Sequence, residues 1–169
     1  MIRGLATGSA VAALAIAGCG GDSGTTEATT AAEAVDAAAF KDCIFSSSLE
    51  RGIYQEVKNP AAQVAQVAED GDAEFFEGGA GSDGLVFFYV PSDPAGAEDL
   101  SATVESTLTE LAGTLQTEAP KGMTLGAASA DTEGGVVFGM IPFSAQGGQT
   151  LTDDTRSDVS KCIEETAAS

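Results

Sequence analysis

Histidine and tryptophan are absent from this 169-residue chain, and basic residues are scarce. Without histidine there is no Ser-His-Asp or Cys-His catalysis, no histidine-based zinc site and no ordinary histidine general base. Seven Lys and Arg against 26 Asp and Glu give a formal net charge of −19. This excess disfavours nucleic acid and anionic lipid headgroups as partners, because both are bound through Lys and Arg. It favours a cation or a basic partner.

An apolar run near the N-terminus, residues 11–17, follows Arg3 and ends just before Cys19. Such a run suits the hydrophobic part of an export signal and is too short to span a bilayer. The segment Ile16-Ala17-Gly18-Cys19 resembles the lipobox of bacterial lipoproteins, with an aliphatic residue, two small residues and a cysteine. The resemblance covers residues 1–19 alone, and the rest of the chain resembles no family.

The lipobox resemblance implies that residues 1–18 are a signal peptide and that Cys19 receives a diacylglycerol. The protein would then sit on the extracytoplasmic face of the cell membrane, or on the outer membrane of a cell with two. Two alternatives remain open. The Ala15-Ile16-Ala17 segment also fits an ordinary signal peptidase site, which would release a soluble protein, and the run could remain as an uncleaved anchor.

Residues 20–33 carry no large apolar side chain and are predicted to form a flexible linker behind Cys19. Such a segment has a root-mean-square reach of roughly 20 Å as a random coil. Removal of residues 1–18 takes away Arg3 and no acidic residue, so the net charge of −19 would become −20.

Residues 34–169 are predicted to form a single α+β domain, since 43% of the chain is hydrophobic. Apolar residues at helical spacing predict helices near 35–47, 60–71, 93–115 and 153–163. The β-prone segments predict strands near 53–57, 73–77, 85–90, 123–128 and 135–141. This order favours an antiparallel sheet with a split β-α-β, ferredoxin-like core, plus an N-terminal and a C-terminal helix.

Two of the predicted strands, 85–90 and 136–141, are apolar on both alternating faces. That pattern is typical of central strands covered on both sides. A ferredoxin-like sheet would leave one face open, so a terminal helix or a partner is expected to cover it.

Cys43 and Cys162 are the cysteines that remain once Cys19 is lipidated. Both lie on apolar faces of predicted helices, and an exported compartment is oxidising. A disulfide between the first and last helices is therefore predicted. Two buried free thiols are the main alternative, since no C-x-x-C spacing indicates a redox pair.

Two further segments match known site motifs only in part. Asp70, Asp72 and Glu74 alternate like the start of a calcium loop, but the later glycine and glutamate of that loop are missing, so no metal site or cofactor is predicted. Gly79–Gly84 matches a dinucleotide-binding glycine pattern, but a strand follows it where a helix is required, so a hairpin loop is expected.

The segment that ends the last strand offers a candidate apolar contact site at Met140, Ile141 and Phe143. The leading functional interpretation is a lipid-anchored, non-enzymatic module that binds an envelope protein or a small ligand. The alternative is a carboxylate- or metal-assisted enzyme of the cell envelope, because paired carboxylates can do acid–base work. A structural role in the cell envelope is a third interpretation. The carboxylates considered for the enzyme are Asp131, Glu133, Asp153 and Asp154.

Overall fold

A computed structural model describes residues 34–46 and 54–167 of the chain, which belong to one unit. The order of elements is α1 (Ala37–Ile44), β1 (Tyr54–Glu56), α2 (Ala62–Asp70), β2 (Ala73–Ala80), β3 (Gly84–Pro91), a 3-10 turn (Pro94–Gly96), α3 (Ala97–Glu118), β4 (Ser129–Glu133), β5 (Val136–Pro142) and α4 (Gly148–Ala167). The predicted signal peptide, Cys19 and the linker lie outside the described residues.

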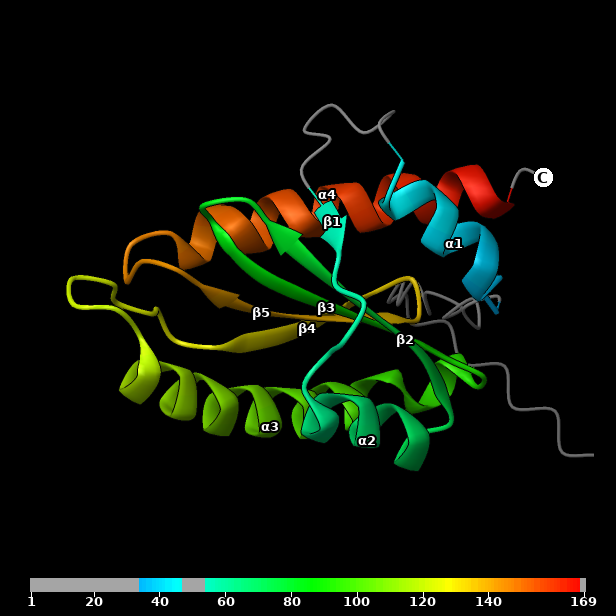
Figure 1. The fold of residues 1–169 in the computed structure, drawn as a ribbon. Coiled ribbons are helices and arrows are strands. Elements are labelled where there is room, and N and C mark those ends of the chain that lie inside the picture. The colour runs from blue at the N-terminus through cyan, green and yellow to red at the C-terminus, as the bar shows by residue number, and fades with distance from the viewer. Residues whose placement is uncertain (1–33, 47–53, 168–169) are drawn as a thin grey trace, which may run out of the picture. The chain divides into compact units, whose positions relative to one another are not determined.

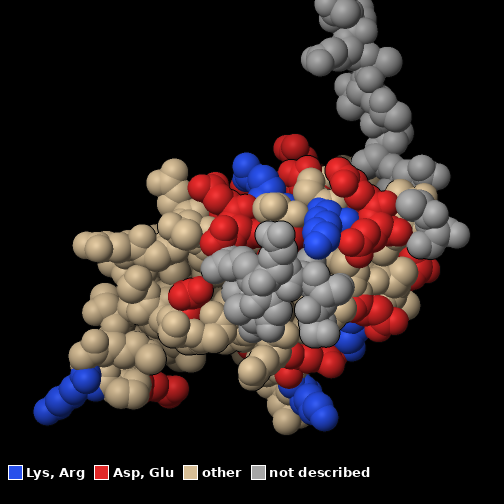
Figure 2. Space-filling model, turned by 90° about the horizontal axis from the view of Figure 1, so that it is seen from above, with Lys and Arg blue, Asp and Glu red and all other residues tan. Residues whose placement is uncertain are grey.

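The five strands form one sheet in the order β1-β2-β3-β5-β4, and every neighbouring pair is antiparallel. Helices lie on both sides of this sheet, with α1 and α4 on one face and α2 and α3 on the other (Figure 1). Asp and Glu side chains are spread over the surface on the α1 and α4 side (Figure 2). The predicted α+β class is therefore confirmed. The prediction that a terminal helix covers the second face is also confirmed, because α1 and α4 both pack there.

The ferredoxin-like arrangement is not confirmed. A split connection is present once, since β3 and β4 are joined by α3 and have β5 between them. The strands joined by α2, β1 and β2, are direct antiparallel neighbours instead. This pairing places Tyr54 of β1 on the α4 side, where its hydroxyl contacts Thr155 and Asp158.

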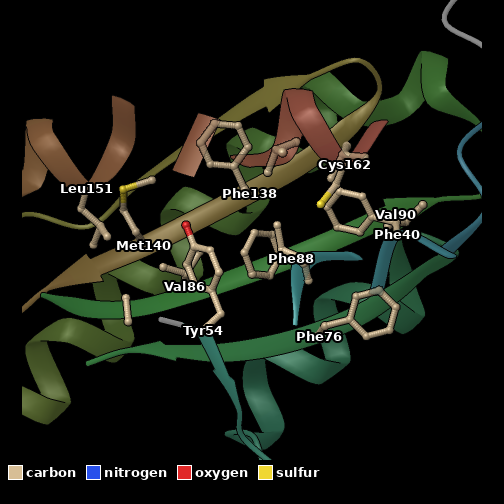
Figure 3. Close-up of a cluster of buried hydrophobic side chains, with 14 residues drawn as sticks. Phe40, Tyr54, Phe76, Val86, Phe88, Val90, Phe138, Met140, Leu151 and Cys162 are labelled. Atoms are coloured by element: carbon tan, nitrogen blue, oxygen red, sulfur yellow. The ribbon is translucent and has the colours of Figure 1, made fainter. Parts of the chain in front are cut away.

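The two central strands separate two hydrophobic clusters. We call the side covered by α1 and α4 the disulfide face, and the side covered by α2 and α3 the α3 face. Alternate residues of β3 point to opposite sides, so Phe88 belongs to the disulfide face and Phe87 to the α3 face. Both side chains are fully buried. Figure 3 shows the Phe88 ring between Tyr54 and Phe40 on the disulfide face.

The strand predicted at 123–128 is wrong, and β4 forms from the next five residues, 129–133. The reason is the turn. Gly134 and Gly135 both have positive φ, at 54° and 86°, and Glu133 pairs directly with Val136. A two-residue turn with positive φ at both positions suits a tight hairpin, and glycine adopts it without steric cost. The hairpin therefore closes at Gly134 and Gly135, so that residues 129–133 form the strand before the turn.

Candidate functional site

An apolar hollow lies where α3 ends, and we call it the α3 hollow. Its volume is about 260 Å³ and its lining is almost wholly apolar. Its main side chains come from β3, α3, the loop after α3 and the residue after β5. They are Leu85, Leu115, Glu118, Met123, Leu125 and Phe143.

The loop that forms one wall of the α3 hollow is held by specific hydrogen bonds. The Met123 amide donates to the Pro120 carbonyl across a tight turn, with Gly122 at φ 97°. The Gln116 side-chain amide donates to the Met123 carbonyl at 3.3 Å, and its oxygen accepts from the Leu125 amide at 2.8 Å. These bonds hold the backbone of the loop against α3, so the wall is formed before any ligand arrives.

Met123 is the one exposed large hydrophobic residue among the described residues, and 41% of its surface is accessible to solvent. A methionine side chain is flexible and polarisable, and it adapts to differently shaped apolar partners. Leu85, Leu115, Leu125 and Phe143 are half-buried around it. The hollow thus combines a fixed wall with one adaptable, accessible side chain.

The predicted apolar contact at the end of β5 is only partly accessible. Met140 and Ile141 are both fully buried, and they point into opposite clusters because strand residues alternate. Phe143 follows the strand, and its amide donates to the Asp83 carbonyl at 2.9 Å. Of the three predicted residues, Phe143 alone lines the α3 hollow. It does so together with Met123 and Leu125, which the sequence predicted to lie in a strand.

The charge beside the α3 hollow is negative. Glu118 is an exposed lining residue at the end of α3, and the last turn of this helix carries no basic residue. Helix α3 as a whole holds five acidic and no basic side chains. The free carbonyls of a helix C-terminus add a partial negative charge. Lys121 is the nearby cation in the loop, and it is exposed.

The four carboxylates considered for an enzyme are not brought together. Asp131 forms an ion pair with Arg156, and Glu133 accepts a hydrogen bond from Ser160. Asp153 is exposed on α4. Asp154 lines a separate hollow with Ser82 and Asp83. Two of the four are therefore engaged in structural contacts between β4 and α4.

The acidic residues considered for calcium lie at the turn between α2 and β2. Asp70 ends α2 and accepts from the Gln66 side chain at 3.0 Å, while Asp72 has a φ of 47° and Glu74 is exposed on β2. Asp70 and Asp72 line one hollow with Asp99. No group of three or more His, Cys, Asp or Glu side chains is placed to hold a metal ion within the described ranges.

Glu77 of β2 is a buried acidic residue that the sequence did not single out. Its side chain is 8% exposed on the α3 face, and its Oε2 atom has no hydrogen-bond partner. Burial raises the pKa of Glu77, and a hydrogen bond from the Ala61 backbone partly opposes this rise. Ala61 is the N-cap of α2 and makes no side-chain cap hydrogen bond, and the helix predicted near 60–71 begins at Ala62. Burial, and secondarily the Glu77 charge, raises the pKa of Tyr89.

Glu77 could have been found from two signals in the sequence. It shares the alternating position of Phe75 in a predicted strand, and it is thus placed on an apolar face. The helix predicted before this strand opens with Ala61-Ala62, which offer no side-chain acceptor to its first amides, so it also calls for an outside hydrogen-bond acceptor.

Cys43 of α1 and Cys162 of α4 form a disulfide, with a Cα–Cα distance of 5.6 Å. The pairing is the one predicted from the sequence. It joins the two helices of the disulfide face and encloses a segment of 119 residues.

Comparison with known proteins adds no assignment, because no family model, no curated protein and no solved structure matches the chain. Within the described residues, no helix is both long and apolar enough to span a bilayer.

Proposed function

We propose that this protein is a lipid-anchored, extracytoplasmic binding module whose binding site is the α3 hollow. The anchor is supported by the residues Ile16–Cys19, which follow an apolar run of the right length. The linker at 20–33 gives the domain roughly 20 Å of reach from the membrane. A non-enzymatic role is supported by Asp131 and Glu133, because both carboxylates are engaged by side chains of α4.

The observation that carries the binding role is the α3 hollow itself. Its lining is almost wholly apolar, its loop wall is fixed by Gln116, and Met123 is 41% exposed beside it. An exposed apolar concavity on a strongly charged protein is typical of an interaction site.

The anchor is tested by labelled palmitate in cells of the source organism. The full chain is expected to incorporate label and to stay in the membrane fraction, whereas Cys19→Ala loses both. The matched control is the double variant Cys43→Ala and Cys162→Ala, which should keep the label. Equal membrane retention of Cys19→Ala and the parent would refute the anchor.

The binding site is tested by photo-crosslinking in intact cells. A photoreactive phenylalanine analogue at position 123 is expected to give a discrete adduct. The same analogue at Thr109, an exposed position on α3, should give none. The α3 hollow is rejected as the binding site if position 123 gives no adduct, or if both positions give the same products.

A further inference from the structure

The size of the α3 hollow limits what it can hold. At about 260 Å³ it falls below the roughly 300–1,000 Å³ of pockets that enclose small molecules. Glu118 and Met123 on its edge are exposed, so the hollow is open to solvent. An open hollow of this size suits apolar side chains that project from a larger partner and anchor it.

The rim of the hollow selects for positive charge. Glu118 and the carbonyls at the end of α3 place negative charge directly beside the apolar lining. Glu118 is the one charged side chain that lines the hollow, and the neighbouring Lys121 is not among the lining residues. A cation next to an apolar anchor would therefore meet a favourable potential.

We infer that the occupant of the α3 hollow is a segment of another exported protein in which an apolar side chain is flanked by Lys or Arg. This inference rests on the proposed binding function. The apolar side chain fills the hollow beside Met123, and the flanking cation lies against Glu118 and the end of α3. The apolar anchor supplies affinity, and the charge supplies selectivity.

Charge also weighs against two other occupants. A second copy of the chain carries the same net charge of −19, so long-range repulsion opposes self-association. A membrane surface with anionic headgroups is repelled by the same excess.

Addition of a partner strand at β4 is disfavoured by the edge itself. The Asp131 carboxylate accepts the Thr132 amide at 2.8 Å, so this side chain occupies a backbone donor that a new strand would need. Charged side chains on an edge strand oppose pairing with another strand. A partner is therefore not expected to pair with the backbone of β4.

The inference is tested with short peptides that share a central Leu-Phe pair and differ only in the flanking residues, which are Lys, Ser or Glu. A fourth peptide keeps the lysines and replaces Leu-Phe by Ser-Ser. Binding is measured by fluorescence anisotropy against the full lipidated chain in nanodiscs of neutral phosphatidylcholine. Empty nanodiscs correct for binding to lipid.

The lysine-flanked peptide is expected to bind about three- to tenfold tighter than the serine-flanked peptide at low salt. Glu118→Gln should reduce this preference, because it removes the charge on the rim. Glu105→Gln is the matched control: it removes the same charge from the same helix, about 20 Å away, and should leave the preference intact. Salt of about 1 M, with a Debye length of about 3 Å, should abolish the preference.

The outcomes separate the inference from the proposed function. If the lysine and serine peptides bind equally at the α3 hollow, or if the glutamate peptide binds tightest, the inference of a basic partner is wrong. The assignment of the binding site to the α3 hollow is then retained. If none of the Leu-Phe peptides binds, both are wrong. If the peptide without Leu-Phe binds as tightly as the lysine-flanked one, the apolar anchor is wrong.

Discussion

On the disulfide face, α1 and α4 are joined to each other and to the sheet by a disulfide, contacts between aromatic rings and a buried polar network. On the α3 face, α2 and α3 pack mainly aliphatic side chains against the sheet. Half-buried members of that aliphatic cluster, such as Leu115 and Leu125, continue into the α3 hollow. The disulfide face thus carries the cross-link and the polar network that stabilise the fold. On the α3 face, apolar surface becomes accessible at the end of α3.

The buried acids show the same difference. Asp158 on the disulfide face accepts the Tyr54 hydroxyl at 2.9 Å. Glu77 on the α3 face has one oxygen with no partner and a raised pKa. A buried polar group is stabilising when its hydrogen bonds are complete and costly when they are not. Removing each group should therefore change stability in opposite directions.

The largest expected effect is loss of the disulfide. The double variant Cys43→Ala and Cys162→Ala should lose roughly 4–5 kcal/mol of unfolding free energy, because a closed loop of this length restricts the unfolded chain. The melting temperature should fall by about 10–20 °C. A reductant should reproduce the loss in the parent and leave the double variant unchanged. Equal melting temperatures of parent and double variant would show that the disulfide contributes nothing to stability.

Phe87 and Phe88 offer a matched pair, since both are fully buried and lie on opposite faces. Phe88 makes edge contacts with the rings of Phe40, Phe45 and Tyr54. Phe88→Ala should cost about 3–5 kcal/mol in chemical unfolding, and about 1–3 kcal/mol more than Phe87→Ala. An equal or larger loss for Phe87→Ala would mean that the aromatic contacts do not distinguish the faces.

The two tyrosines give the next comparison. Tyr54→Phe removes hydrogen bonds to Thr155 and to the Asp158 carboxylate and should cost about 1.5–3 kcal/mol. Tyr89→Phe removes one bond to the Val64 carbonyl and should cost about 0.5–1.5 kcal/mol. Urea unfolding of both variants measures the difference. The polar network is unimportant if Tyr54→Phe proves the milder change.

The smallest effect is a gain in stability. The folded state of the parent holds the Glu77 proton more tightly than the unfolded chain, so this group favours folding below its ordinary pKa of 4.5 and loses that contribution as pH rises through its raised value. Glu77→Gln should therefore be more stable than the parent by about 1 kcal/mol near pH 8, with a smaller gain near pH 4. Thermal melts across this range measure the gain. Glu74→Gln, an exposed change in the same strand, should shift stability by less than about 0.5 kcal/mol. A gain that grows as pH falls would contradict the sign.

Local pattern predicted the elements that are long and periodic. Leu100, Val104, Leu108 and Leu111 fall on the buried stripe of α3, and the apolar strands β3 and β5 lie at the centre of the sheet. The Cys43–Cys162 pair was predictable because these two cysteines remain once Cys19 is assigned to the lipobox-like motif, and both lie on apolar faces of predicted helices. These features depend on spacing along the chain or on counting.

The α3 hollow was not predictable, because its residues are distant in sequence. Met123 and Leu125 are apolar, so they were assigned to a strand, but Gln116 binds the backbone that a strand would use. The Tyr54–Asp158 contact spans 104 residues and has no local signal. The order of strands in a sheet depends on which strand edges pair in the folded chain, and no local sequence pattern records this. The order β1-β2-β3-β5-β4 could therefore not be derived from the segments alone.

The most direct test of the central claim uses the two methionines of the domain, one on each face. Met123 lies at the α3 hollow and is 41% exposed, and Met140 is fully buried on the disulfide face. In the full lipidated chain labelled at its methionine methyl groups, the lysine-flanked Leu-Phe peptide should shift the Met123 signal and leave that of Met140 unchanged. An unmoved Met123 signal, or a Met140 signal that moves as far, would contradict the assignment of binding to the α3 face.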